Sequence, residues 1–262
     1  MTRLEETLQG LRGEGRAALM AYLCAGDPTV EGSIEGLAAA AQAGADILEV
    51  GWPFSDPVAD GPVIQAASER ALRHTRREDV IAAVAALRQR VAQPIAVLSY
   101  CNPLISAGRD ETLHVLAQAG ADALVVPDLP MEESAAWRQA AQAEGLAITQ
   151  FIAPTTDAQR LPHIAEAADG FVYAVALLGV TGSAEDSAES ILPVVDALRR
   201  HRDVPVLAGF GIGDGASAKR WRSRGLDGVI VGSALVQAMA ERGPEGVRRA
   251  VREIRAGLDS VG

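Results

Sequence analysis

Short apolar runs alternate with helical patterns along the whole chain, and this alternation limits the possible folds most strongly. The helical patterns place apolar residues three and four positions apart, as in Ile34, Leu37 and Ala41 or Val80, Val84 and Leu87. Eight strands that are each followed by a helix are typical of a TIM (β/α)8 barrel, so we expect an α/β fold with residues 1–262 as a single domain. The apolar runs span residues 18–23, 46–50, 94–100, 123–126, 146–152, 171–175, 205–208 and 228–231.

A small, glycine-containing repeat supports the barrel. It occurs at 43–46, 119–122, 167–170 and 224–227, in each case before an even-numbered strand. Glycine is typical of a helix end and aspartate of the turn into a strand. Such turns also occur in other α/β proteins, and a doubly wound open sheet is the main alternative. The glycines at 209, 211, 213 and 215 do not form the G-x-G-x-x-G pattern that would favour that alternative.

The N-terminal segment predicts an extra helix ahead of the barrel. Leu4, Leu8 and Leu11 share one helical face, and residues 1–15 contain no apolar core of a signal peptide. No apolar run approaches the roughly 18 residues that a membrane span needs. The chain has two cysteines, Cys24 and Cys101, which fits a reduced protein of the cytoplasm.

The charge and the rarity of basic residues exclude several classes of function. The net charge of −10 argues against a nucleic-acid partner. A Schiff-base aldolase needs a desolvated lysine, whereas the single lysine, Lys219, lies in a polar helical stretch. The four histidines show no metal-ligand spacing. We therefore expect acid–base chemistry by carboxylates, with no metal and no cofactor.

Glu49 is the strongest catalytic candidate. It interrupts the apolar strand 46–50 one position before its end, where a carboxylate would point into the barrel or its mouth. Burial would raise its pKa toward the range that suits proton transfer. A structural hydrogen bond at the strand end is the alternative. Asp56 and Asp60 lie in the following loop, where both also fit ordinary turn chemistry beside Pro57 and before Gly61.

Two glycine clusters indicate phosphate binding. Residues 209–213 (GFGIG) follow the seventh strand, and residues 232–234 (GSA) follow the eighth strand and open a helix. Barrel enzymes commonly bind phosphate at these loops through backbone N–H groups and a helix N-terminus. Plain turns are the alternative interpretation.

The same segments carry a family pattern. Residues 48–62 (LEVGWPFSDPVADGP) resemble the signature of tryptophan synthase alpha chains. Further matching motifs follow in order and span nearly the whole chain: GDP at 26–28, Tyr100 with NP at 102–103, PDLP at 127–130, GVTG at 179–182, GFGI at 209–212 and GSA at 232–234. The resemblance implies cleavage of indole-3-glycerol phosphate into indole and glyceraldehyde 3-phosphate, a step of tryptophan biosynthesis.

The resemblance also implies a role for individual residues. Glu49 would protonate indole C3, Asp60 would accept a hydrogen bond from the indole N–H, and Tyr173 would lie beside Glu49. The remaining substrate-binding residues would be Tyr22, Leu98, Tyr100, Leu129, Thr181, Gly182, Phe210, Gly211, Gly232 and Ser233. A beta chain, in an α2β2 heterotetramer, would contact Asp56, Pro57, Asn102 and Pro130.

The chain departs from the family pattern at several positions. Trp52 replaces a small aliphatic residue, Cys24 replaces a threonine, and the loop 176–187 lacks the usual basic residue. These changes leave two alternatives open: a stand-alone indole-3-glycerol phosphate lyase, or a non-catalytic activator of a beta chain. A phosphoribosyl isomerase or an indole-glycerol phosphate synthase is a further rival, but such enzymes usually need a lysine or a second acid at other strand ends.

Overall fold

The computed structural model describes residues 2–175 and 184–261 and places nine parallel strands of this part of the chain in one sheet. The strands run in the order β5-β4-β3-β2-β1-β9-β8-β7-β6 and curve into a barrel. Their bounds are β1 (Ala18–Cys24), β2 (Ile47–Gly51), β3 (Ile95–Leu98), β4 (Ala123–Val125), β5 (Ala147–Ile148), β6 (Gln150–Ile152), β7 (Val172–Ala174), β8 (Val206–Ala208) and β9 (Gly228–Val231).

The two end strands of the sheet are neighbours in the chain, since only Thr149 separates β5 from β6. The β5 segment pairs with β4, and the Thr149 N–H donates to the Leu124 carbonyl at 3.0 Å. The β6 segment pairs with β7 instead. The predicted single strand 146–152 is therefore two short strands, because this segment passes from one neighbour to the other at Thr149. The prediction of eight barrel strands is otherwise confirmed.

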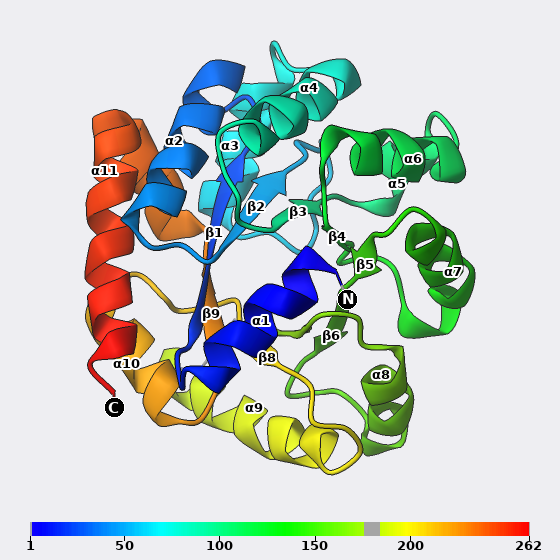
Figure 1. Ribbon diagram of the computed structural model, residues 1–262, viewed down its shortest axis with the longest axis vertical. Helices are drawn as coiled ribbons and strands as arrows, with labels where there is room; N and C mark the ends of the chain where they lie inside the picture. The colour runs from blue at the N-terminus through cyan, green and yellow to red at the C-terminus, as the bar shows by residue number, and fades with distance from the viewer. Residues whose placement is uncertain (1, 176–183, 262) are drawn as a thin grey trace.

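Helices surround the sheet (Figure 1). They are α1 (Arg3–Gly13), α2 (Val30–Ala43), α3 (Pro62–Leu72), α4 (Arg77–Arg88), α5 (Cys101–Ile105), α6 (Arg109–Ala119), α7 (Ala135–Ala143), α8 (Leu161–Ala167), α9 (Ala184–Arg199), α10 (Gly215–Ser223) and α11 (Ser233–Asp259), with short 3-10 helices η1 (Met131–Glu133) and η2 (Ala158–Arg160). The predicted apolar faces point inward, as the burial of Ile34, Leu37, Val84 and Leu116 shows. Non-helical angles at Gly243 divide α11 into two helical parts.

The glycine of each repeated turn adopts a left-handed conformation. The φ angles are 111° at Gly44, 95° at Gly120, 77° at Gly170 and 82° at Gly225. Side chains rarely adopt this region, so glycine suits the turn from a helix back into the sheet. Gly44 and Gly120 cap α2 and α6, and Gly225 directly follows the cap of α10. Gly170 differs, because it lies three residues beyond the end of α8. Three of the four repeats therefore have the helix-ending glycine that the sequence predicts.

The aspartates of three repeats anchor the start of a neighbouring strand. Asp46, Asp122 and Asp227 accept backbone N–H groups of Leu19, Ile95 and Val206, respectively, at 2.8–2.9 Å. Asp169 precedes the glycine of its repeat, one position earlier than the other three aspartates, and accepts a hydrogen bond from the side chain of Gln142 instead. In three of the four repeats, the aspartate thus accepts a hydrogen bond from the backbone at the start of the adjacent strand.

Each of these aspartates also faces an arginine from a barrel helix. The ion pairs are Arg255–Asp46 at 3.1 Å, Arg88–Asp122 at 3.3 Å, Arg199–Asp227 at 2.7 Å and a longer one, Arg138–Asp169, at 4.0 Å. The arginines belong to helices α11, α4, α9 and α7, respectively. The same aspartate–arginine pair thus occurs four times around the amino-terminal end of the barrel.

Helix α1 covers this amino-terminal end of the barrel (Figure 1). The predicted face of Leu4, Leu8 and Leu11 is buried. Arg3 binds Asp122 at 2.5 Å and Arg12 binds Asp227 at 2.9 Å.

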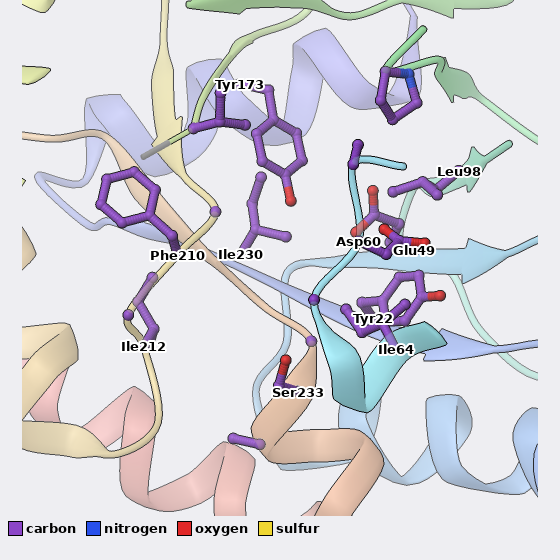
Figure 2. Close-up of a pocket in the computed structure, with 18 of the residues that line it drawn as sticks. Tyr22, Glu49, Asp60, Ile64, Leu98, Tyr173, Phe210, Ile212, Ile230 and Ser233 are labelled. Carbon is purple, nitrogen blue, oxygen red and sulfur yellow. The ribbon is translucent and has the colours of Figure 1, made fainter. Parts of the chain in front are cut away.

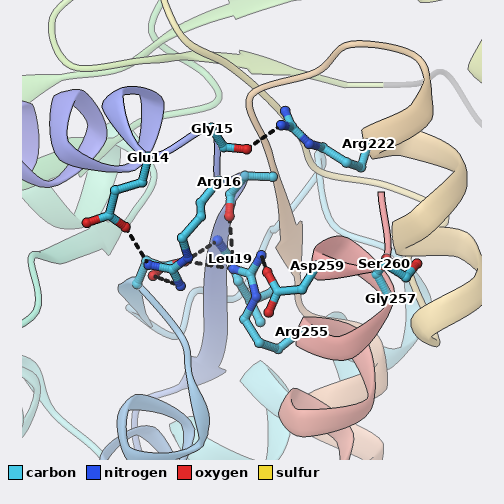
Figure 3. Close-up of polar contacts among 11 residues, drawn as sticks. Glu14, Gly15, Arg16, Leu19, Arg222, Arg255, Gly257, Asp259 and Ser260 are labelled. Atoms are coloured by element: carbon cyan, nitrogen blue, oxygen red, sulfur yellow. Dashed lines mark hydrogen bonds and ion pairs between the residues drawn. The ribbon is translucent and has the colours of Figure 1, made fainter. Parts of the chain in front are cut away.

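Arg16, just after α1, lies 3.6 Å from Asp46. Figure 3 shows Arg16 and Arg255 converging beside Leu19, where Asp46 accepts the Leu19 N–H. Because one end of the barrel is covered in this way, the site has to be sought at the carboxyl ends of the strands.

Candidate active site

A cavity of about 470 Å³ lies at the carboxyl ends of the barrel strands (Figure 2). Residues at or just beyond the ends of most strands line it, as expected for a barrel enzyme. The lining residues are Tyr22, Glu49, Ala59, Asp60, Gly61, Ile64, Leu98, Pro127, Phe151, Tyr173, Val175, Gly209, Phe210, Gly211, Ile212, Gly213, Ile230, Gly232, Ser233, Ala234 and Gln237.

Glu49 is buried in the apolar strand β2 and lines this cavity. Its side chain is 1% exposed, and its Oε1 atom has no hydrogen-bond partner. Burial raises the pKa of Glu49 to about 8, and the nearby charge of Asp60 contributes to the increase. A buried carboxyl group without a partner is costly, so it is favoured in its neutral form and available to a ligand.

Asp60 faces the same space from the loop after β2 (Figure 2). Burial raises its pKa to about 6, although the hydroxyl group of Tyr100 offsets part of this increase. At neutral pH, Asp60 is thus mainly ionised while Glu49 is mainly protonated. Because their pKa values differ, one carboxyl group can donate a proton while the other remains an anion.

Tyr100 supports the loop that carries Asp60. Its hydroxyl oxygen accepts the N–H of Ala59 at 3.0 Å, and its ring stacks on Phe54 with ring centroids 5.2 Å apart. The side chain is 1% exposed and is not among the residues that line the cavity. The structure therefore places Tyr100 behind the loop rather than at the cavity wall.

Two tyrosines flank the carboxyl groups, and each lies over a glycine. A Cβ atom at Gly51 would overlap the Tyr22 hydroxyl group, and one at Gly209 would overlap the ring of Tyr173. Tyr22 is the register partner of Glu49 across β1 and β2, so both side chains enter the cavity at the same level. Burial is the main cause that raises the pKa of both tyrosines, and the charge of Glu49 adds to it.

Glycine-rich backbone forms the opposite side of the cavity. Gly211 has a φ angle of 66°, and Gly232 begins α11 without a side-chain cap. The first N–H groups of a helix have no partner within the helix, so they are free to bind an anion. Phe210 lies on this side with its ring edge-on to Trp221, with centroids 4.9 Å apart.

The structure brings together most of the predicted site residues. Glu49, Asp60, Tyr173, Tyr22, Leu98, Phe210, Gly211, Gly232 and Ser233 line one cavity. Leu129 is half-buried against the core and does not line it. Thr181 and Gly182 lie outside the described residues. The candidate interface residues Asp56, Asn102 and Pro130 are exposed, and Pro57 is half-buried.

The sequence did not point to several lining residues. Ile64, Phe151, Ile230 and Gln237 line the cavity. Strands of a barrel are apolar on both faces, so an apolar residue in a strand does not reveal which face it occupies. Phe151 could have been identified as a lining residue, since it lies near the end of a predicted strand. Gln237 could also have been identified, because it follows the predicted site residue Ser233 by one helical turn.

The two unusual residues near the cavity are buried. Trp52 is 7% exposed, its backbone N–H donates to the Leu98 carbonyl at 2.8 Å, and it is not among the lining residues. Cys24 lies 3.9 Å from the Ser68 hydroxyl, and burial raises the pKa of its thiol to about 12. The thiol is therefore neutral and acts as a packing group.

Two features are absent from the described residues, a metal-ligand cluster and a membrane-spanning helix. These residues contain no group of three or more His, Cys, Asp or Glu side chains arranged to hold a metal ion. In the same part of the chain, no helix has both the length and the apolar surface that crossing a bilayer requires.

Comparison with known proteins identifies the family. The family model described as tryptophan synthase alpha chain matches residues 8–259. The chain belongs to the tryptophan synthase alpha chain family. The alpha chain of Synechococcus elongatus is 43% identical over 260 residues, which are 99% of this chain and 98% of that relative. The alpha chain of Thioalkalivibrio sulfidiphilus is 44% identical and covers 98% of this chain and 97% of its own length.

Solved structures show the same fold. The tryptophan synthase of M. tuberculosis in an aminoacrylate-bound form matches with a TM-score of 0.88 at 36% identity, covering 98% of this chain and 100% of that one. The alpha subunit from Legionella pneumophila matches with a TM-score of 0.90 at 32% identity, covering 100% of both chains. Members of this family are lyases, which fits a site built from carboxyl groups.

Proposed function

We propose that this protein cleaves indole-3-glycerol phosphate to indole and glyceraldehyde 3-phosphate, as the alpha subunit of tryptophan synthase. One observation supports this function above the others. The buried, unpartnered carboxyl group of Glu49 faces Asp60 at one side of a cavity whose other side is glycine-rich backbone. Such a cavity suits a substrate with an aromatic ring at one end and a phosphate at the other.

In this proposal, Glu49 donates its proton to indole C3. The glycerol hydroxyl next to the scissile bond then loses its proton, the carbonyl of glyceraldehyde 3-phosphate forms, and the electron pair of the broken carbon–carbon bond returns to the indole ring. Glu49 is protonated at neutral pH because its pKa is about 8. It can act as a general acid in the first step and as a base afterwards.

Asp60 would stabilise the protonated indole through a hydrogen bond from the ring N–H. Its pKa of about 6 keeps it ionised at neutral pH, which a hydrogen-bond acceptor requires. Tyr173, Tyr22 and Leu98 would enclose the ring and exclude water, which strengthens these electrostatic interactions.

The phosphate would bind at the start of α11 and at the loop after β8. The backbone N–H groups near Gly211, Gly232 and Ser233 supply donors, and the glycines allow close approach. The family resemblance adds Thr181 and Gly182 to this set. No cofactor is needed for this reaction.

We also propose a beta chain as the partner, in an α2β2 assembly within the cytoplasm. Asp56, Asn102 and Pro130 are exposed and follow strands β2, β3 and β4 at the end of the barrel that holds the cavity. Residues 1–262 would act as one domain, because Arg12 and Arg255 tie both ends of the chain to aspartates of the same barrel.

Indole release from indole-3-glycerol phosphate, by the purified chain alone and with a tryptophan synthase beta chain, tests this function. We expect slow cleavage by the chain alone and an increase of about one to two orders of magnitude on mixing, since closing loops often limit turnover. Fast cleavage that the beta chain does not change would support a stand-alone lyase. No cleavage under either condition would refute the proposed reaction.

A further inference from the structure

The described lining of the cavity contains no lysine, arginine or histidine. Within this described set, its only acidic side chains are the carboxyl groups of Glu49 and Asp60. The adjoining residues 176–183 (ALLGVTGS) also contain no basic residue in the sequence. A phosphate in this cavity would therefore be recognised by N–H and O–H donors rather than by an ion pair.

Gln237 is placed to supply such a donor. Ser233, Ala234 and Gln237 line the cavity from the first turns of α11, so they share one face of this helix. Helical side chains lean toward the helix N-terminus, which directs the Gln237 side chain toward the uncapped start at Gly232. Among the described lining residues, Gln237 alone carries a side-chain N–H.

A neutral donor also suits a reaction whose product keeps the phosphate. Substrate and glyceraldehyde 3-phosphate would bind this end of the cavity through the same group. A cationic side chain would stabilise both to the same extent, which lowers KM without lowering the barrier and slows the release of product. An amide supplies a hydrogen bond without this strong charge attraction.

We propose that Gln237 is a specificity-determining residue that donates a hydrogen bond to the phosphate of the substrate. This inference rests on the proposed function, because it takes the phosphate end of the cavity to lie at the start of α11. Gln237 acts on binding of the phosphate group and leaves the chemistry at Glu49 unchanged.

Calorimetric titration with two ligands tests this role. The ligands are indole-3-propanol phosphate and indole-3-propanol, which differ only in the phosphate group. The proteins are the wild type, Gln237→Ala, Gln237→Lys and Gln237→Glu. Glu241→Gln is the matched control, because Glu241 lies one turn further along α11, is exposed, and does not line the cavity. It changes the net charge by the same amount as Gln237→Lys.

We expect the variants to change the Kd of the phosphate ester alone. Gln237→Ala should weaken its binding about fivefold and Gln237→Glu more than about tenfold, whereas Gln237→Lys should tighten it about tenfold. Binding of indole-3-propanol should stay within about twofold of the wild type in every protein. In turnover, Gln237→Lys should lower KM and also kcat, and product inhibition should become stronger.

Three results would overturn the role of Gln237. Gln237→Ala and Gln237→Glu could bind the phosphate ester as the wild type does. The variants could change the binding of both ligands equally, which would indicate an altered cavity shape. Glu241→Gln could lower the Kd of the phosphate ester as much as Gln237→Lys does, which would indicate a general charge effect. Failure of the proposed function is distinct, because the wild type would then release no indole.

Discussion

Glu49 is the residue at which local sequence rules and the fold conflict. A carboxyl group in the middle of an apolar strand destabilises the protein unless it stays neutral or finds a partner. Here its Oε1 atom has no partner, and burial raises its pKa to about 8. Such a residue is retained for its chemistry rather than for stability, and its pKa makes that chemistry testable.

The pH dependence of kcat/KM should be bell-shaped. Activity needs Asp60 ionised and Glu49 protonated, so it should increase with pH near 6 and decrease near 8. Initial rates of indole release across this range give the profile. Asp60→Asn should lower activity and remove the acidic limb. A variant that keeps the acidic limb would show that another group causes it.

Unfolding free energy should reveal the energetic cost of Glu49. Between the usual glutamate pKa of 4.5 and its value of about 8 here, the folded state keeps a proton that the unfolded state has released. This contribution therefore lowers stability as the pH rises through that interval. Glu49→Gln should be more stable than the wild type at about pH 9, by roughly 2–5 kcal/mol, and the difference should vanish near pH 4.

Urea unfolding of both proteins at several pH values measures this difference. A constant difference between the two proteins across the whole range would contradict a raised pKa of Glu49 in the folded state.

Even alanine, the smallest side chain, should disturb the site when it replaces Gly51. A methyl group there would overlap the Tyr22 hydroxyl group, so Gly51→Ala should displace this ring beside Glu49 and lower kcat/KM about tenfold or more. Gly61→Ala is the control, because Gly61 lines the same cavity but has open space around its Cβ position. Equal rates for the two variants would show that the position of Tyr22 does not matter.

At the scale of elements, helix α1 and the aspartates of the repeat hold the amino-terminal end of the barrel together. Asp122 illustrates the arrangement, because it accepts the Ile95 N–H and binds both Arg88 and Arg3. Asp169 lies one position earlier in its repeat, before the glycine, and its side chain contacts Gln142 and, at a longer distance, Arg138. The repeat is thus uneven, and the two aspartates should differ in their contribution to stability.

Asp122→Ala should lower the unfolding free energy by about 2–4 kcal/mol, because it leaves the buried Ile95 N–H without its acceptor and removes the ion pair of the partly buried Arg88. Asp169→Ala should lower it by less than about 1 kcal/mol. Urea unfolding at neutral pH, monitored by circular dichroism, measures both variants. Equal losses would contradict the unequal roles that the contacts indicate.

Most elements could be predicted from the sequence, since each carries a local signal. The helix face of Leu4, Leu8 and Leu11 and the glycine turn at Gly44 follow from periodicity and backbone preference. The division of the fifth strand at Thr149 could not be predicted, because it depends on which neighbours its two segments meet.

For the whole molecule, the barrel follows from the alternation of apolar runs and helices, and the proposed catalytic pair, Glu49 and Asp60, follows from the family signature. The cavity as a whole does not. Phe151 and Ile230 look like any other strand residue until the closed sheet decides which side chains face inward. Tyr100 is predicted to bind the substrate; in the structure it is not among the residues that line the cavity, and its hydroxyl group accepts the N–H of Ala59 in the Asp60 loop. Long-range packing alone determines such positions.

The proposed reaction depends on Glu49 as the proton donor for carbon–carbon cleavage. The most direct test is the rate of indole release from indole-3-glycerol phosphate by the wild type and by Glu49→Gln, with the beta chain present and equal circular dichroism spectra. We expect the variant to lose more than about 99% of the activity, since a general acid contributes about 10²-fold or more. A variant that retains more than about a tenth of the wild-type rate would contradict the assignment of Glu49 and the proposed mechanism.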